Sequence, residues 1–395
     1  MSSELLDSAR QIEPRIVNTR RTIHSHPEMG YQEEQTSTLV QARLRDLGIP
    51  FRAGLAKTGV VAQIKGELGD GPCVLLRADM DALPIDEQSG VPFSSEVPGV
   101  MHACGHDAHT AMLLGAAELI LDRRSTFAGT VKLMFQPAEE GGGGAARMIE
   151  DGVLSEPRVD AAFMLHVWPD LDVGQVACGP GPQLAGADAF TITVNGRGGH
   201  GARPHETVDP VVVGAQIVLA MQTLVSREVD PTVPAVVTLA VFNAGTVSNV
   251  IPDRAVLKGT IRAFDDVLFK HLEQRVREVA TGIAATLRAS VDVDFAMSYP
   301  PSVCDAAMAD HLGASASGVV GSDSVLPSKP EMGAEDFAFV LQQVPGAMLW
   351  LGVKKPEWPE PKPVHTATFD IDEGALPIGS SAMAAVALDY LLKER

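Results

Sequence analysis

The spacing of apolar positions divides the chain into an outer part and a middle part. In the outer part, short apolar runs of strand type alternate with segments that have helical spacing. The runs predict strands at residues 60–64, 73–78, 131–135, 161–167 and 347–351. The helical segments are residues 5–23, 32–47, 110–121, 145–149 and 375–392. This alternation predicts an α/β domain with a mostly parallel sheet.

From about residue 186 the order of elements changes. A strand at 189–195 is followed by a helix at 208–226, strands at 235–242 and 255–261, a helix at 266–288 and a strand at 291–298. This βαββαβ order is typical of a ferredoxin-like α+β domain. We therefore predict a discontinuous α/β domain, residues 1–185 and 299–395, with a second domain inserted at 186–298. The uncharged run 210–226 is short for a membrane span, so a buried helix is expected there.

Polar side chains follow the predicted parallel strands. Asp79 and Asp81 come after the strand at 73–78, and Glu139 and Glu140 come shortly after the strand at 131–135. His166 ends the apolar run that begins at residue 161. Ligand sites in such sheets lie beyond the carboxyl ends of the strands, so these groups are expected at one edge.

Residues 101–110 concentrate side chains that bind metals. Thiolate sulfur and imidazole nitrogen suit borderline-soft divalent cations, and Cys104 and His106 are only two residues apart. Gly105 between them permits a turn that a side chain would block. The helix that follows is expected to be capped by Asp107 or Thr110. The competing interpretation is an ordinary turn that contains a buried cysteine.

The adjacent carboxylates Glu139 and Glu140 can divide two tasks. One can bind a metal while the other accepts a proton from a metal-bound water. An isolated Glu pair is more often a solvated acidic turn, but this pair lies between a buried strand and the four glycines 141–144. A phosphate-binding loop is disfavoured because no Lys-Ser/Thr pair follows the glycines.

Composition narrows the classes of function. The chain has 395 residues, with 31 basic against 50 acidic side chains, a formal charge of −19. This excess disfavours a nucleic-acid or anionic-membrane partner. Residues 1–16 lack the apolar core of a secretory signal, and the four cysteines form no close pair. Reduced thiols and a cytoplasmic location are therefore expected.

Several separated motifs together resemble the M20 metallopeptidase family, in its amidohydrolase branch of hippurate hydrolases, N-acyl-amino-acid amidohydrolases and auxin-conjugate hydrolases. The resemblance extends from about His24 to the last helix. It is carried by His-Ser-His-Pro-Glu at 24–28, Arg-Ala-Asp-Met-Asp-Ala-Leu-Pro at 77–84, His-Ala-Cys-Gly-His-Asp-Ala-His at 102–109, Gln-Pro-Ala-Glu-Glu at 136–140, His166, Gly-Gly-His-Gly-Ala-Arg-Pro-His at 198–205 and His365.

The resemblance implies a binuclear metal site. The ligands of two divalent ions, manganese or zinc with cobalt and nickel as further options, would be Cys104, His106, Glu140, His166 and His365. Glu139 would be the general base. Other branches carry His-x-Asp where this chain has Asp79-Met80-Asp81, so Asp79 and Asp81 are expected to support ligand histidines instead of binding metal themselves.

The resemblance also gives the inserted domain a role as a lid and a dimerisation domain. His200 would polarise the scissile carbonyl, from the partner subunit in dimeric relatives. Asn249 would position the substrate, and Arg262, with Arg254 as its rival, would bind a substrate carboxylate. The segment 333–337, Gly-Ala-Glu-Asp-Phe, also resembles the family but receives no role.

The expected function is metal-dependent hydrolysis of the amide bond of N-acyl amino acids, which are small-molecule substrates. The expected assembly is a homodimer or a higher homo-oligomer. A dipeptidase or carboxypeptidase of the same family is the first alternative. A non-catalytic metal-binding or ligand-binding protein is a second, although it would not need Glu139 beside Glu140. A thiol enzyme that uses Cys104 leaves His166 and His365 unexplained.

Overall fold

The computed structural model describes residues 2–393, which form two compact units. The first unit contains Met1–Gln183, Val303–Lys329 and Asp336–Arg395, of which Met1 and residues 394–395 lie outside the described range. The second contains Leu184–Ser302 and Pro330–Glu335. The insertion predicted at 186–298 falls inside the second unit, to which the sequence pattern did not assign Pro330–Glu335.

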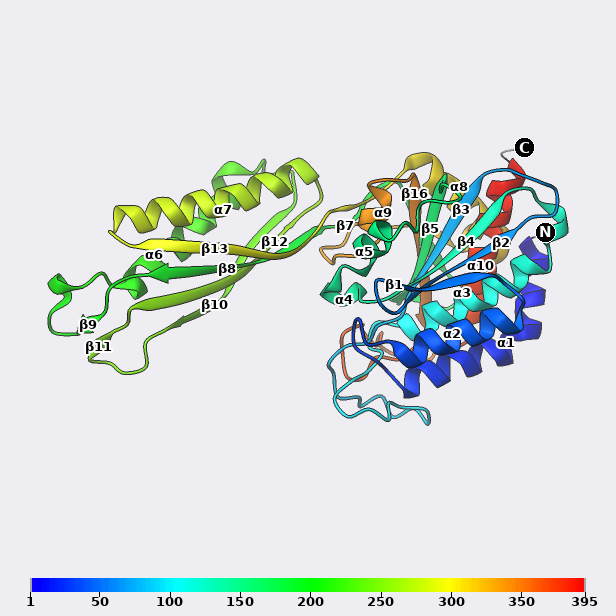
Figure 1. The fold of residues 1–395 in the computed structure, drawn as a ribbon, viewed down its shortest axis with the longest axis horizontal. Helices are drawn as coiled ribbons and strands as arrows, with labels where there is room; N and C mark the ends of the chain where they lie inside the picture. Colours follow the sequence, from blue (N-terminus) through cyan, green and yellow to red (C-terminus); the bar gives the residue numbers. More distant parts are fainter. Residues whose placement is uncertain (1, 394–395) are drawn as a thin grey trace. The chain divides into compact units, whose positions relative to one another are not determined.

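An eight-stranded mixed sheet forms the centre of the first unit (Figure 1). Its order is β1 (Phe51–Leu55), β2 (Gly59–Lys65), β4 (Thr130–Gln136), β3 (Cys73–Asp79), β5 (Ala161–Asp172), β16 (Gly346–Lys354), β6 (Val176–Cys178) and β15 (Val325–Pro327). The central strands β4, β3, β5 and β16 are parallel to one another. The predicted α/β fold with a mostly parallel sheet is thereby confirmed.

Helices pack on this sheet and on one another. The long helices are α1 (Ser2–Ser25), α2 (Glu34–Asp46), α3 (His106–Leu121), α8 (Ala306–Val320) and α10 (Ala375–Lys393). Shorter ones are α4 (Glu139–Gly142), α5 (Gly144–Glu150), α9 (Ala338–Leu341) and the turns η1 (Arg124–Thr126) and η4 (Ser322–Ser324). Helix α3 packs on β3 and lies against α1 and α10. Because α3 contacts neighbours around most of its surface, almost all its side chains are buried.

Some elements differ from the sequence prediction for identifiable reasons. Strand β5 continues six residues past His166, since β16 pairs with it as far as Asp172. His166 is therefore inside a strand and not at its end. The pattern did not indicate β1, whose middle residues are exposed, or α8, which is rich in small residues. Strands β6 and β15, of three residues each, are too short to give a period.

The second unit is a four-stranded antiparallel sheet covered by two helices (Figure 1). Its elements are β8 (Gly186–Asn195), α6 (Pro210–Thr223), β10 (Ala235–Ala244), β12 (Arg254–Ala263), α7 (Asp266–Thr286) and β13 (Ser290–Tyr299). The strand order β10-β12-β8-β13, with both helices as crossovers, is the ferredoxin-like topology that the sequence predicts. Asp209 and Asp265 cap α6 and α7 through their side chains.

Smaller elements complete the second unit and its connections. Strands β9 (Gly199–His200) and β11 (Val250–Ile251) pair with each other, and β9 lies near the 3₁₀ turn η2 (Pro204–Glu206). The π-helical turn η3 (Leu224–Glu228) follows α6. Strands β7 (Gly181–Leu184) and β14 (Ser302–Cys304) pair where the chain passes between the units.

Among residues 2–393, two helices have the length and apolar composition of a membrane span. For α10, 78% of the apolar window is buried, so its composition is that of a core helix. For Pro210–Glu228 only 33% is buried, and the expectation of a buried helix there is wrong in part. Val213, Ile217 and Met221 enter the core of the second unit, whereas Val212 and Leu219 are exposed.

Candidate metal centre

Gly105 determines how the loop 101–105 enters helix α3. It occupies the N-cap position with φ +86, and a Cβ atom there would lie 2.4 Å from Val167 Cγ2. Glycine is therefore required by both backbone conformation and space. No side chain of the described residues caps the helix, so the predicted cap by Asp107 or Thr110 is wrong. The early start at His106 places Cys104 and His106 on either side of a tight turn.

Asp107 instead joins the start of α3 to α1. Its Oδ2 accepts hydrogen bonds from Arg20 Nε at 3.0 Å and His24 Nδ1 at 2.8 Å. Burial would lower the pKa of His24, but Asp107, together with a hydrogen bond to Glu87, outweighs it and raises the pKa to about 9. A carboxylate in the first turn of a helix also interacts favourably with the positive end of the helix dipole. This buried ion pair fixes the position of the loop that carries Cys104.

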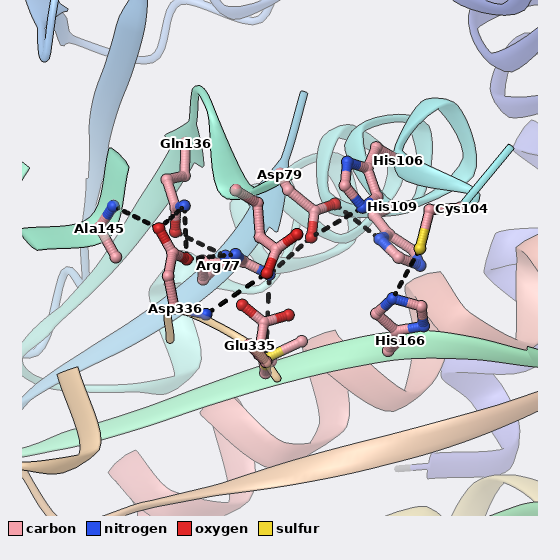
Figure 2. A network of polar contacts seen from close by, with 12 residues as sticks. Arg77, Asp79, Cys104, His106, His109, Gln136, Ala145, His166, Glu335 and Asp336 are labelled. Carbon is pink, nitrogen blue, oxygen red and sulfur yellow. Dashed lines mark hydrogen bonds and ion pairs between the residues drawn. The ribbon is translucent and has the colours of Figure 1, made fainter. Parts of the chain in front are cut away.

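His166 faces Cys104 with one ring nitrogen. Its Nδ1 donates to Val167 O at 2.7 Å, so its Nε2 carries the lone pair, and Nε2 lies 3.5 Å from Cys104 Sγ (Figure 2). Burial holds the pKa of His166 well below its usual range. The ring is therefore neutral, in the tautomer that a metal ligand would need.

Asp81 organises the turn that carries the two glutamates. Its Oδ1 accepts from Glu139 N at 3.0 Å and its Oδ2 from Glu140 N at 2.9 Å. Oδ1 also lies 3.3 Å from His106 Nδ1. Burial would lower the pKa of His106, but Asp79, whose Oδ2 lies 3.6 Å from Nε2, and Asp81 outweigh it and raise the pKa to about 10. Because Nδ1 donates to Asp81, the ring nitrogen left for a cation is Nε2. This atom is buried and makes no hydrogen bond with any described residue.

Both oxygens of Asp79 already have partners. Oδ1 accepts from His109 Nδ1 at 2.6 Å, and Oδ2 accepts from Arg77 Nη1 at 2.6 Å. His109 Nε2 in turn accepts from Val167 N at 2.9 Å. Burial would raise the pKa of Asp79, but His106, Arg77 and His109 hold it well below its usual range. Asp79 and His109 are thus engaged with protein groups, which favours a supporting role for them over metal binding.

Glu140 meets His365, which comes from the far end of the sequence. His365 Nε2 lies 3.0 Å from Glu140 Oε1, and His365 N donates to Ala103 O at 2.7 Å. The hydrogen bond that His365 donates to Glu140 raises the pKa of His365. The backbone of His365 is left-handed, with φ +60, an uncommon conformation for a residue with a side chain. The pairing with Ala103 therefore brings His365 to the loop that contains Cys104.

The five predicted ligands gather around Cys104. Atoms of three sets lie within 4.8 Å of one another: Cys104, His106 and His166; Cys104, Glu140 and His365; and His106, Glu139 and Glu140. All of these residues belong to the first unit. Sulfur, nitrogen and oxygen donors in overlapping sets, with the buried Nε2 of His106 among them, fit divalent cations.

The protonation of Cys104 argues against a thiol enzyme. Burial, followed by the charges of Glu140 and Glu139, raises the pKa of its thiol well above the usual range. A nucleophilic cysteine needs surroundings that lower its pKa. A divalent cation supplies that stabilisation directly, because the thiolate is the form that binds it.

The predicted residues of the second unit occupy two different ends of its sheet. Val250 pairs with His200 and Asn249 O accepts from Gly201 N at 2.8 Å, so His200 and Asn249 are neighbours. Both lie in the connections just beyond the end of the sheet at which Arg254 pairs with Asn195. Arg262 pairs with Ala187 at the opposite end. The second unit therefore does not bring Arg262 together with His200 and Asn249.

Sequence reasoning missed a group of buried polar side chains beneath the site. Arg77, Gln136 and Asp336 form a hydrogen-bonded network next to Asp79 (Figure 2). The signal was a charged residue, Arg77, within the apolar run of strand β3 and ahead of Asp79. An arginine at such a position requires carboxylate partners, because a buried unpaired charge is very costly.

Comparisons with known proteins agree with this architecture. The model of a family described as Peptidase family M20/M25/M40 matches residues 75–389. An Arabidopsis thaliana protein, IAA-amino acid hydrolase ILR1-like 4, is 43% identical over 383 residues, which cover 96% of this chain and 86% of that protein. Thermostable carboxypeptidase 2 of Saccharolobus solfataricus is 40% identical over 391 residues, 98% of each protein.

A solved structure also covers nearly the whole chain. It is that of a Bacillus subtilis protein described as a dinuclear metal binding peptidase from the M20 family. The TM-score is 0.83 and the identity 36%, with 97% of this chain and 99% of that one covered.

Proposed function

The chain belongs to peptidase family M20/M25/M40, and from this premise we propose that it hydrolyses the amide bond of N-acyl amino acids, with Glu139 as general base beside two divalent metal ions. That it is a metal-binding hydrolase acting on small amino-acid conjugates follows from the family and its relatives. The observation that carries the finer proposal is the gathering of five donor side chains around Cys104, with Glu139 adjacent.

Cys104, His106, Glu140, His166 and His365 would hold the ions, manganese or zinc. When bound, such ions lower the pKa of a water molecule and polarise an amide carbonyl. Asp81 and Val167 O accept from the Nδ1 atoms of His106 and His166, so in each ring Nε2 is the atom that would bind an ion. His166 is neutral, whereas His106, with its raised pKa, would release a proton on binding. Little rearrangement of these two rings is needed for binding.

Glu139 is placed to move a proton. It is 6% exposed, and its backbone is held by Asp81. Glu140, its neighbour, is committed to the ligand set through its contact with His365. We infer that Glu139 accepts a proton from the attacking water and delivers it to the leaving amine.

In the second unit, His200 would stabilise the developing oxyanion and Asn249 would orient the substrate. Arg262, or its rival Arg254, would bind the substrate carboxylate as a bidentate partner. Arg262 and Arg254 lie eight residues apart on β12, about 26 Å at the rise of a β-strand. An N-acyl amino acid is shorter than this. If Arg262 acts together with His200 and Asn249, the three must come from two copies of the chain.

An exposed apolar surface on the second unit supports a homodimer. Val211, Val212 and Leu219 on α6 are 39%, 53% and 65% exposed, and Phe242 on β10 is 40% exposed. A Cβ atom on Gly214 of α6 would lie 2.8 Å from Phe242, so the surface continues from helix to strand. Strand β10 is at the edge of its sheet. Exposed apolar groups beside a free edge are typical of an interface between chains.

Complementation between two inactive variants tests the role of His200 across the dimer. We expect Glu139→Gln and His200→Ala each to be nearly inactive alone. Co-expressed in equal amounts, they should recover about a quarter of wild-type turnover, since half of the dimers are mixed and each of these has one intact site. The measurement is turnover per mole of total protein, together with the mass of the particle in solution. A monomer, or mixed dimers without recovery, would contradict the proposal.

One observation favours a second candidate function: the carboxypeptidase relative matches this chain as completely as the hydrolase relative. The two functions differ in the group on the acyl side of the bond. A carboxypeptidase accepts a peptide there, whereas an N-acyl amino acid hydrolase accepts a simple acyl or aryl group.

A substrate panel on metal-reconstituted protein separates these functions. We expect kcat/KM for N-acetyl and N-benzoyl amino acids to exceed that for dipeptides and for longer peptides by about 10-fold or more, the difference that one or two misplaced polar groups in a pocket produce. The same amino acid on the leaving side serves as the matched control. Higher kcat/KM for peptides would establish the carboxypeptidase, and no turnover of any compound would favour a binding protein.

A further inference from the structure

The segment 333–337, which the sequence analysis left without a role, contains a fully buried carboxylate. Asp336 Oδ1 accepts from Arg77 Nη2 at 3.0 Å and from Gln136 Nε2 at 2.7 Å. Its Oδ2 accepts from Gln136 Nε2 at 2.9 Å and from the backbone N–H of Ala145 at 2.9 Å (Figure 2). Each oxygen therefore faces two donors, and the side chain has one well-defined position.

Arg77 links this carboxylate to the supports of the metal centre. Its Nε donates to Gln136 Oε1 at 2.8 Å, its Nη1 to Asp79 and its Nη2 to Asp336. The planar guanidinium sets the angle between these bonds. Since the side chains of Arg77, Asp79 and Asp336 have no exposed surface, water does not compete for the bonds. Asp336 and Asp79 are thus held by one rigid group.

The backbone of Asp336 contacts the proposed general base. Its N–H points at Glu139 Oε1 at 3.4 Å, longer than the roughly 2.7–3.2 Å usual for such a bond. Asp81 holds the backbone of the same residue through Glu139 N at 3.0 Å. One aspartate therefore fixes the main chain of Glu139, and another, through its N–H, contacts the carboxylate.

We propose that Asp336 is a positioning residue for the Glu139 carboxylate, held for this purpose by Arg77 and Gln136. It acts through its backbone N–H, and its side chain serves as the anchor of that N–H group. The inference rests on the proposed role of Glu139 as base. A general base must stay within hydrogen-bond reach of the water in the correct direction, and a displacement of about 1 Å can reduce the rate by about 100-fold.

The first test is Asp336→Asn. The asparagine amide has the same shape as the carboxylate, but its NH2 group cannot accept hydrogen bonds. Donor groups face both oxygen positions, so in either orientation the NH2 group meets a donor and the anchor is broken. We expect kcat to fall by about 10-fold to 100-fold. The metal content of the purified protein should stay that of the wild type. KM should change by less than about 2-fold, because the substitution affects proton transfer in the transition state and not the binding of the substrate.

Lys132→Met is the matched control. Lys132 is a buried cation on β4, the strand that ends in Gln136, and its Nζ donates to the carbonyls of Val153 at 2.9 Å and Pro157 at 2.7 Å. We expect this variant to lower the thermal midpoint while kcat remains that of the wild type. Gln136→Met is a milder second variant that removes the bonds of one side chain to Asp336. If Asp336→Asn does not fold, Gln136→Met should show the same selective fall in kcat.

The decisive experiment is a double-mutant cycle with Glu139→Gln. If Asp336 acts through Glu139, then Asp336→Asn causes no further loss once the base is gone. A merely structural role would give losses that multiply. Multiplied losses, or wild-type kcat in Asp336→Asn and Gln136→Met, would overturn the positioning role while Glu139 remains the base. Full turnover in Glu139→Gln alone would instead refute the base, and the positioning role with it.

Discussion

Glu139→Gln should lose about 1,000-fold in kcat while it keeps its metal ions. The amide has nearly the same size and can still accept a hydrogen bond from Asp336 N, but it cannot take a proton from water. General acid–base catalysis by a positioned side chain contributes about 100-fold to 10,000-fold, so the loss should lie within that range. The ligand set, Glu140 included, is not altered by this change.

The measurements are steady-state kcat and the metal content of the same sample. Glu150→Gln is the matched control, because it makes the same chemical change at an exposed residue at the end of α5. It should have wild-type kcat and metal content. If Glu139→Gln turned over substrate like Glu150→Gln, Glu139 would not be the base. If it lost its metal as well, Glu139 would be a ligand and the roles of the two glutamates would be exchanged.

Cys104→Ser should have the largest effect on metal binding. Cys104 belongs to two of the three sets of converging donors, so its loss weakens the binding of both proposed ions. A serine hydroxyl is a much poorer ligand than a thiolate for these cations. We expect the affinity for zinc or manganese to fall by about 100-fold or more, since even the supports of a ligand are worth 10-fold to 100-fold. Turnover at limiting metal should fall with it.

Cys178→Ser separates this effect from the loss of a buried thiol. Cys178 is 9% exposed and lies in β6, outside the proposed ligand set. This variant should keep wild-type metal affinity, and its only change should be in stability. Wild-type metal affinity in Cys104→Ser would remove Cys104 from the ligand set. An equal loss of affinity in both serine variants would show that the effect arises from the fold.

Much of the fold was predictable because the apolar runs had a clear period. Strands such as β3 and β4 are buried along almost their whole length, and the acidic residues of the site follow at their carboxyl ends. The βαββαβ order of the second unit was equally clear. The start of α3 could not be predicted, because it depends on the left-handed backbone of Gly105 and on the space beside Val167. Neither of these affects the spacing of apolar residues in the sequence.

The candidate site was predictable where residues are close in sequence or where a family motif names them. The nearness of Cys104 to His106 is local, whereas the contact between Glu140 and His365 joins positions 225 residues apart and came from resemblance alone. The network of Arg77, Gln136 and Asp336 depends on three distant segments and on the direction of buried side chains. Only the charge of Arg77 within an apolar strand indicated it.

The central claim is that five side chains hold two divalent ions and that hydrolysis needs them. The most direct measurement is the number of ions bound per chain, taken together with turnover as metal-free protein is titrated with zinc or manganese. We predict two ions per chain at saturation, no turnover in the metal-free protein, and turnover that rises as the sites fill. Full turnover by protein from which chelation has removed all metal would contradict it.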